Sequence, residues 1–364
     1  MWKQTALTRQ LGLSVPIIQG PFGGGLSSVE LTALVSEAGG MGSFGAHHQT
    51  AEQIMQTVRA IRERTRQPFA INLWIPQADS ERLQLDEAAF AQYIQPLQPF
   101  FDELGMAPPT LPEQFWPPYA EQVEAVLAAR PPVFSFVFGI PSPDILQRCR
   151  ELGIQTLGAA TTVDEAVALE QAGVDMIVAT GFEAGGHRVS FLRSAEASLT
   201  GTFALVPQVV DAVKVPVIAA GGIADGRGIA AALTLGAHGA QIGTAFLACQ
   251  QSSASALHRQ MLFSPQARYT GLTRAFSGRL ARGIRNRLMD ALQGYEASLP
   301  PYPLQYWVAG TLKAAALAQG RADLMALWCG QSAALLRETD AAALMDSLVA
   351  QTGEILDARR TGNG

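Results

Sequence analysis

The sequence predicts an α/β fold, a closed (β/α)8 TIM barrel with a helical second domain. Over the first two thirds of the chain, short apolar runs alternate with amphipathic stretches, and the apolar runs number eight. Strict alternation favours parallel strands joined by helices, and eight strands favour closure into a barrel over an open doubly wound sheet. A chain of 364 residues that is 48% hydrophobic is long enough to bury a core of this size.

Each expected strand is a short apolar run that ends at a polar or glycine residue. The expected strands are Pro16–Gly20, Met41–Phe44, Phe69–Trp74, Val133–Phe138, Ile154–Ala159, Asp175–Thr180, Val215–Ala220 and Ala240–Gly243. Several of the helical stretches between them open with Ser, Thr or Asp, the residues that cap helix N-termini. The expected helices are Ser28–Ala38, Ala51–Glu63, Pro143–Leu152, Val163–Ala172, Phe203–Val213 and Arg227–Leu235.

Two segments interrupt this rhythm. Residues 76–131 form an insertion whose proline-rich middle cannot be one regular helix, and we expect it to lie over the barrel mouth. From about Gln250 onward, helical periodicity replaces the strand pattern, as in Gly310–Gln319, Ala322–Trp328 and Ala341–Ile355. We therefore expect a barrel over residues 1–250 and a mainly helical cap domain over residues 251–364.

Charge and composition exclude several classes of function. The net charge is −5 and the arginines form no basic stripe, so nucleic acid is not an expected partner. No run approaches the roughly 18 apolar residues of a membrane span. The three cysteines are far apart and lack CxxC spacing, which indicates a reducing cytoplasm. No set of histidines and carboxylates has metal-ligand spacing, so no metal site is expected.

Glycines at two neighbouring strand ends predict a phosphate site. Gly221 and Gly222 follow the seventh strand, and Gly243 and Thr244 follow the eighth. In barrels of this class the loops after these two strands commonly bind phosphate through backbone N–H groups and a helix start. The alternative is that the glycine pair only turns a tight corner.

The first and third strands end in groups that suit a flat heterocyclic ring. Gln19 and Asn72 have amides that can bond the polar edge of such a ring, and Gly20 with the glycines after it can admit it. The glycine-rich loop after the first strand lacks GxGxxG spacing, so a Rossmann dinucleotide site is disfavoured.

His187 is the candidate catalytic residue. The sixth strand ends at Thr180 and leads through GFEAGGH, Gly181 to His187, so Gly185 and Gly186 place the imidazole at the carboxyl end of the barrel, on the side of the phosphate site. We expect Glu183 to bond neighbouring loop amides. The other histidines, His47, His48, His238 and His258, are expected to be packed or surface residues.

These segments together resemble class I nitronate monooxygenase, formerly called 2-nitropropane dioxygenase, over nearly the whole chain. The resemblance rests on QGPFGGG, NLW, GFEAGGHR, VPVIAAGGIADGRG, QIGTAFL, SGRLARGIRNR (Ser277 to Arg287) and LWCGQSAALL (Leu327 to Leu336). It implies a barrel that binds FMN and converts nitronates or nitroalkanes with O2 into a carbonyl compound and nitrite. It also implies that His187 is the base and that FMN is surrounded by Asn72, Gly181, Gly221, Gly222, Gln241, Gly243 and Thr244.

The chain departs from this family pattern at three positions. Thr180 stands where the family often has Gln, Val189 where it has Gly, and Val137 where some members have His. Thr180 can still bond a flavin atom, with shorter reach. Because of these three differences, the substrate range of the family does not carry over directly to this chain.

Two other functions stay open at this point. GxEAGGH is shared with flavin-dependent enoyl-acyl-carrier-protein reductase II, so an NAD(P)H-dependent flavin reductase of the enoyl-thioester or quinone type is one alternative. A non-catalytic flavin-binding protein is the other. If His187 is a base, its ordinary pKa of about 6.5 suits proton transfer near neutrality.

Overall fold

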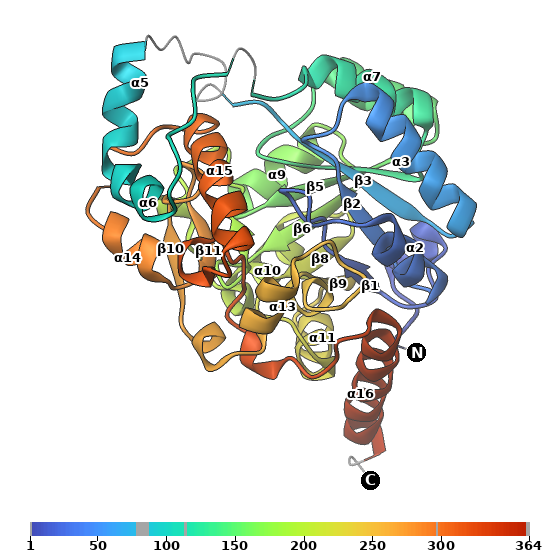
Figure 1. Ribbon diagram of the computed structural model, residues 1–364. Coiled ribbons are helices and arrows are strands. Elements are labelled where there is room, and N and C mark those ends of the chain that lie inside the picture. Colours follow the sequence, from blue (N-terminus) through green and yellow to red (C-terminus); the bar gives the residue numbers. More distant parts are fainter. Residues whose placement is uncertain (1, 78–86, 113–114, 296–297, 362–364) are drawn as a thin grey trace.

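The core of the protein is a closed barrel of parallel strands (Figure 1). The computed structural model describes residues 2–77, 87–112, 115–295 and 298–361. The barrel strands are β1 (Ile17–Gln19), β2 (Gly42–Gly45), β3 (Phe69–Trp74), β4 (Val133–Val137), β5 (Gln155–Ala160), β6 (Met176–Thr180), β8 (Val217–Ala220) and β9 (Gly239–Ile242). Their order is β1-β9-β8-β6-β5-β4-β3-β2.

The two ends of this sheet meet and close the barrel. Ile18 and Met41 form a parallel bridge. The Gln19 N–H donates to the Met41 carbonyl at 2.9 Å, and the Met41 N–H donates to the Ile17 carbonyl at 3.0 Å. The (β/α)8 TIM barrel predicted from the alternating pattern is therefore confirmed.

Helices cover the outside of the barrel, one after each strand. They are α2 (Val29–Glu37), α3 (Ala51–Arg64), α7 (Tyr119–Ala129), α8 (Pro143–Glu151), α9 (Val163–Gln171), α10 (Thr202–Ala212), α11 (Gly226–Thr234) and α16 (Ala341–Thr361). The side chains of Ser28, Thr50, Thr162 and Asp225 accept bonds from first-turn N–H groups and start four of them.

The eighth helix of the ring comes from the end of the chain. α16 packs against α11 and α2, which closes the ring around the sheet. On α16, Leu344, Met345 and Leu348 are buried. The division at residue 250 expected from the sequence stays a prediction, but the packing of α16 places this part of residues 251–364 against the barrel.

A small antiparallel sheet crosses the carboxyl end of the barrel. It joins β7 (Gly186–His187), β11 (Ala281–Ile284) and β10 (Thr270–Thr273) in the order β10-β11-β7. Sequence periodicity did not predict these strands. A helix over Ala322–Trp328 was wrong: only Ala322–Leu324 forms a 3-10 turn, because Trp328 is extended and bridges Gly283.

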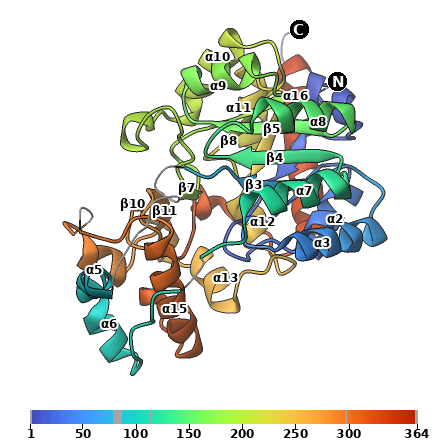
Figure 2. The same cartoon turned by 90° about the horizontal axis from the view of Figure 1, so that it is seen from above.

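A second layer of helices lies beside this small sheet, on one side of the barrel (Figure 2). It contains α5 (Glu87–Ile94) and α6 (Gln98–Glu103) from the insertion, and α13 (Ala256–Leu262), α14 (Arg287–Leu292) and α15 (Leu304–Ala318) from the later chain. Gln319 donates from its side-chain amide to the Leu104 carbonyl at 2.9 Å. Glu103 pairs with Arg321 at 2.7 Å. The insertion and the end of α15 are thus bonded to each other.

The insertion divides into two parts. Its last helix, α7, belongs to the barrel ring and packs against α3. Before it, Trp116 contacts the rings of His47, Tyr302 and Tyr306. The remaining short elements are α1 (Ala6–Leu11) and α12 (Thr244–Leu247). No helix in the described ranges is long and apolar enough to cross a membrane.

Candidate active site

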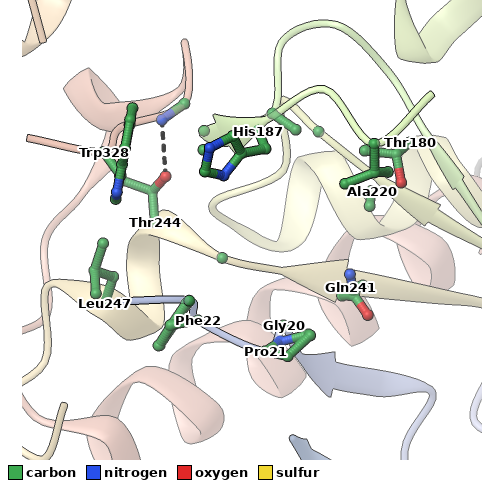
Figure 3. A pocket seen from close by; sticks show the side chains of 18 of the residues that line it. Gly20, Pro21, Phe22, Thr180, His187, Ala220, Gln241, Thr244, Leu247 and Trp328 are labelled. Carbon is green, nitrogen blue, oxygen red and sulfur yellow. Dashed lines mark hydrogen bonds between the residues drawn. The ribbon is translucent and has the colours of Figure 1, made fainter. Parts of the chain in front are cut away.

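A pocket opens at the carboxyl ends of the barrel strands, beneath the small sheet (Figure 3). Most of the residues singled out from the sequence line it: Gly20, Asn72, Thr180, Gly185, Gly186, His187, Gly221, Gly222, Gln241, Gly243 and Thr244. The described lining contains no Asp, Glu, Lys or Arg. An anionic ligand in this pocket therefore meets backbone N–H groups and neutral polar side chains rather than a carboxylate.

The loop after β8 has a conformation that favours glycine. Gly221 and Gly222 have φ angles of +102° and +71°. A side chain is strained in that region, and at Gly221 a Cβ would also lie 2.9 Å from the Thr202 hydroxyl. Opposite, a Cβ at Gly243 would meet nothing within 4 Å. The backbone thus leaves open space beside Gly243, at the end of β9.

Neutral polar groups surround this space. Asn72 donates to the Ser135 hydroxyl at 3.1 Å. Thr244 accepts a bond from the Gly330 N–H at 2.9 Å, which is the dashed line in Figure 3. Gln241 lies next to Gly20, which has no side chain to crowd it. This donor set can bond a phosphate and the edge of a flat ring.

Two of the predicted site residues lie outside the pocket wall. Gln19 is buried; its amide donates to the Gly20 carbonyl and accepts a bond from the Ser43 N–H at 3.0 Å, which ties β1 to β2. At Gly181, a Cβ would collide with the Thr202 hydroxyl, so this glycine serves close packing behind the loop. Cofactor contacts by Gln19 and Gly181 stay predictions.

His187 is held in the pocket wall by the small sheet. As part of β7 it pairs with Ala281 of β11. Its Nε2 lies 2.8 Å from the Ser277 hydroxyl, and Nδ1 has no hydrogen-bond partner among the described residues. Burial, followed by the positive charge of Arg279, lowers the pKa of His187 to about 3. The ordinary pKa near 6.5 used in the sequence analysis therefore does not describe this shielded ring.

Arg279 places a positive charge behind the His187 ring. It is almost fully buried. Its guanidinium carbon lies 3.8 Å from the centre of the Tyr302 ring and 4.4 Å from that of Phe138. The two aromatic faces favour the cation through their quadrupoles. The same charge favours a negatively charged substrate beside His187.

The loop between β6 and β7 is fixed by two charged residues. The Glu183 carboxylate accepts bonds from the Thr202 N–H and hydroxyl, each at 2.9 Å. Glu183 thus bonds the first residue of α10, whereas the sequence analysis expected amides of the neighbouring loop. Arg188 is buried and donates to the carbonyls of Thr180, Gly181 and Ser198. This network sets the direction in which the chain enters β7.

Sequence reasoning missed the aromatic part of the wall. Trp74 and Trp328 line the pocket, with ring centres 5.1 Å and 5.4 Å from that of His187. Trp74 ends β3, a position that could have singled it out as it did Asn72. Trp328 and Ser277 follow no barrel strand, and their only signal was that they lie in motifs shared with the family.

The three departures from the family pattern also line the pocket: Val137, Thr180 and Val189. The four other histidines are packed as expected. For example, the His258 Nε2 bonds the Trp328 carbonyl at 3.1 Å, and the His238 Nδ1 accepts from the Val217 N–H at 3.2 Å. Among the described residues, no group of three or more His, Cys, Asp or Glu is placed to hold a metal ion.

Comparison with known proteins identifies the family. The sequence model described as nitronate monooxygenase matches residues 4–351. A probable nitronate monooxygenase of Staphylococcus aureus (strain MRSA252) is 39% identical over 357 residues, which cover 98% of this chain and 99% of that protein.

Solved structures support the same family. Nitroalkane oxidase from Streptomyces ansochromogenes superposes with a TM-score of 0.88 at 37% identity, covering 97% of this chain and 99% of that chain. FabK from Thermotoga maritima has a TM-score of 0.75 at 25% identity, with 98% and 99% covered. The resemblance seen in the sequence motifs is confirmed, and the chain belongs to the nitronate monooxygenase family.

Proposed function

We propose that this protein is an FMN-dependent enzyme that oxidises alkyl nitronates, and also neutral nitroalkanes, with O2 to a carbonyl compound and nitrite. The observation that carries the proposal is the place of the His187 ring, bonded to Ser277 through Nε2 and in the wall of a glycine-lined pocket. Both the family and the nitroalkane oxidase structure support this substrate class. The three cysteines are buried and unpaired, which is consistent with a cytoplasmic enzyme.

The donor set of the pocket suits FMN. The backbone at Gly221, Gly222 and Gly243, with the Thr244 hydroxyl, would hold the phosphate. Asn72, Thr180 and Gln241 would bond the polar edge of the ring. When bound, FMN supplies the electron-transfer chemistry toward substrate and O2.

We assign proton transfer to His187. The Ser277 hydroxyl has one hydrogen, and the Arg279 carbonyl lies 3.1 Å away as its acceptor. With that hydrogen used, Ser277 accepts from His187, so Nε2 carries the imidazole hydrogen and Nδ1 carries the lone pair. Nδ1 then takes the α-proton of a neutral nitroalkane. An incoming nitronate needs no deprotonation and gains from the charge of Arg279.

Replacement of His187 tests this role. His187→Asn should keep FMN and lose about a hundredfold or more of the turnover of neutral nitroethane, because the base is gone. Turnover of ethyl nitronate should fall much less. The measurements are the flavin absorbance of the purified variant and initial rates on both substrates with O2.

A matched control is His238→Asn. His238 is partly buried at the start of β9, where its Nδ1 accepts the Val217 N–H. This variant should retain both activities. An equal loss on nitroalkane and nitronate in His187→Asn would contradict the base role.

The GFEAGGH motif, which resembles that of flavin-dependent enoyl-acyl-carrier-protein reductase II, favours an NAD(P)H-dependent flavin reductase as the second candidate. Anaerobic addition of NADH or NADPH distinguishes the two. If the protein oxidises nitronates as proposed, the flavin should stay oxidised with NADH and should be reduced by ethyl nitronate. Rapid bleaching of the flavin by NADH alone would support the reductase. Bound FMN that reacts with neither donor would indicate a flavin-binding protein without this activity.

A further inference from the structure

The indole of Trp74 lies on one flank of the His187 ring. Trp74 is the last residue of β3 and lines the pocket. Its ring meets the His187 ring nearly edge-on, with centres 5.1 Å apart and planes at 76°. Phe138 contacts the same indole at 5.2 Å. Any substituent that extends from the reacting carbon toward β3 therefore meets this indole.

The indole is braced from behind by His47. The two rings are stacked, with centres 3.8 Å apart and planes within 4° of each other. Gly23 packs against both: a Cβ at this position would lie 2.9 Å from Cζ2 of Trp74 and 3.2 Å from Cε1 of His47. The glycine makes room for the ring pair, and its backbone blocks movement of the indole in that direction.

His47 is an unusual choice for this position. Its side chain is 5% exposed, and neither ring nitrogen has a hydrogen-bond partner among the described residues. A buried polar group without a partner costs stability. No bond of the imidazole to a described residue accounts for its place, whereas the flat contact with Trp74 does.

We infer that Trp74, positioned by His47, is a specificity-determining residue that limits the substrate to nitronates with short carbon chains. This inference rests on the proposed function and adds the size of the substrate. On this inference a chain of one or two carbons would reach the space beside His187 without meeting the indole, whereas a longer chain directed toward β3 would collide with it. Opening this flank should admit longer chains with little effect on the short ones.

Kinetics on two substrates test the inference. In the wild type, kcat/KM should be lower for hexyl nitronate than for ethyl nitronate. Trp74→Ala should raise the ratio of kcat/KM for hexyl nitronate to that for ethyl nitronate by at least about tenfold. This is the lower end of the discrimination that one methylene group gives in a close-fitting pocket. Trp74→Phe, which keeps an aromatic ring and protects the fold, should lie between. A ratio that stays at the wild-type value in both variants would overturn the inference.

A binding measurement separates this test from the proposed function. Alkyl carboxylates are unreactive planar anions, and changes in flavin absorbance report their dissociation constants. Trp74→Ala should tighten hexanoate relative to propionate by a similar factor. If no variant turns over a nitronate, the proposed function fails, and an unchanged preference between the two carboxylates would independently overturn the role of Trp74.

Variants of His47 test its positioning role. His47→Ala should shift the hexyl-to-ethyl ratio toward that of Trp74→Ala, mainly through KM, because the indole loses its support. His47→Phe restores a flat ring and should restore the wild-type ratio. His48→Ala is the control, since His48 touches the edge of His47 and has no stacking contact with Trp74. If His47→Ala behaves like His48→Ala, His47 does not position the indole.

Discussion

At the scale of single residues, the proposed proton transfer depends on which nitrogen of His187 carries the hydrogen. In the proposal Ser277 sets this through its contact with Nε2 at 2.8 Å, and Ser277 is itself bonded to the N–H and carbonyl of Arg279. Ser277→Ala should keep FMN, and its turnover of neutral nitroethane should fall by about tenfold to a hundredfold. This loss is smaller than the one expected for His187→Asn. Initial rates on nitroethane and ethyl nitronate measure this.

The control is Ser198→Ala, which makes the same change at a buried serine whose hydroxyl bonds the Ser194 carbonyl. It should leave both rates unchanged. If Ser277→Ala slowed both substrates equally, Ser277 would act on something other than the proton-accepting nitrogen.

The sequence indicated only part of this site. His187 and the glycines at Gly221 and Gly243 follow strand ends, so the barrel pattern alone brings them to one edge. Ser277 lies 90 residues from its partner, in the turn between two four-residue strands that are too short for periodicity to predict. Gln19 is the opposite case, because it was predicted from the sequence but lies outside the pocket wall. The three residues of β1 were too few to show from the sequence which side chains face the pocket.

At the scale of elements, the amphipathic pattern identifies a helix but not its packing partner. The helix beginning at Ala341 was predicted, and its place as the eighth barrel helix was not. Contact with α11 is close: a Cβ on Gly226 would lie 2.4 Å from Cβ of Gln351 and 2.6 Å from N of Thr352. Gly226→Ala should therefore push α16 outward and lower the free energy of unfolding by about 1–3 kcal/mol.

Gly310→Ala is the matched control for this contact. Gly310 lies inside α15, where a Cβ would meet nothing within 4 Å. There the same change should raise the free energy of unfolding by about 0.5–1 kcal/mol, through helix propensity. Urea unfolding of both variants gives the comparison. Equal effects of the two substitutions would mean that α16 is not fixed against α11.

At the scale of the whole molecule, stability should depend on pH through three histidines whose pKa values are lowered, His47, His187 and His258. Burial is the main cause that holds the pKa of His47 well below its usual range and lowers those of His187 and His258 to about 3 and about 4. The unfolded chain titrates near pH 6.5, so below that pH it binds protons that the folded protein does not. Stability is therefore lost as the pH falls from about 6.5, in contrast to carboxylates such as Glu103, whose lowered pKa matters only below about 4.5.

The slope of this pH dependence provides the test. Well below pH 6.5, each buried neutral histidine should contribute about 1.4 kcal/mol of lost stability per pH unit. His47→Phe removes one of these histidines without removing a hydrogen bond to a described residue. The stability of the variant should therefore change with pH less steeply than that of the wild type, by about 1.4 kcal/mol per pH unit. Urea unfolding between pH 5 and pH 7, with FMN in excess, gives both slopes. Identical slopes in the wild type and the variant would show that His47 is protonated in the folded protein, which would also place a charge against Trp74 and change how the pocket wall is held.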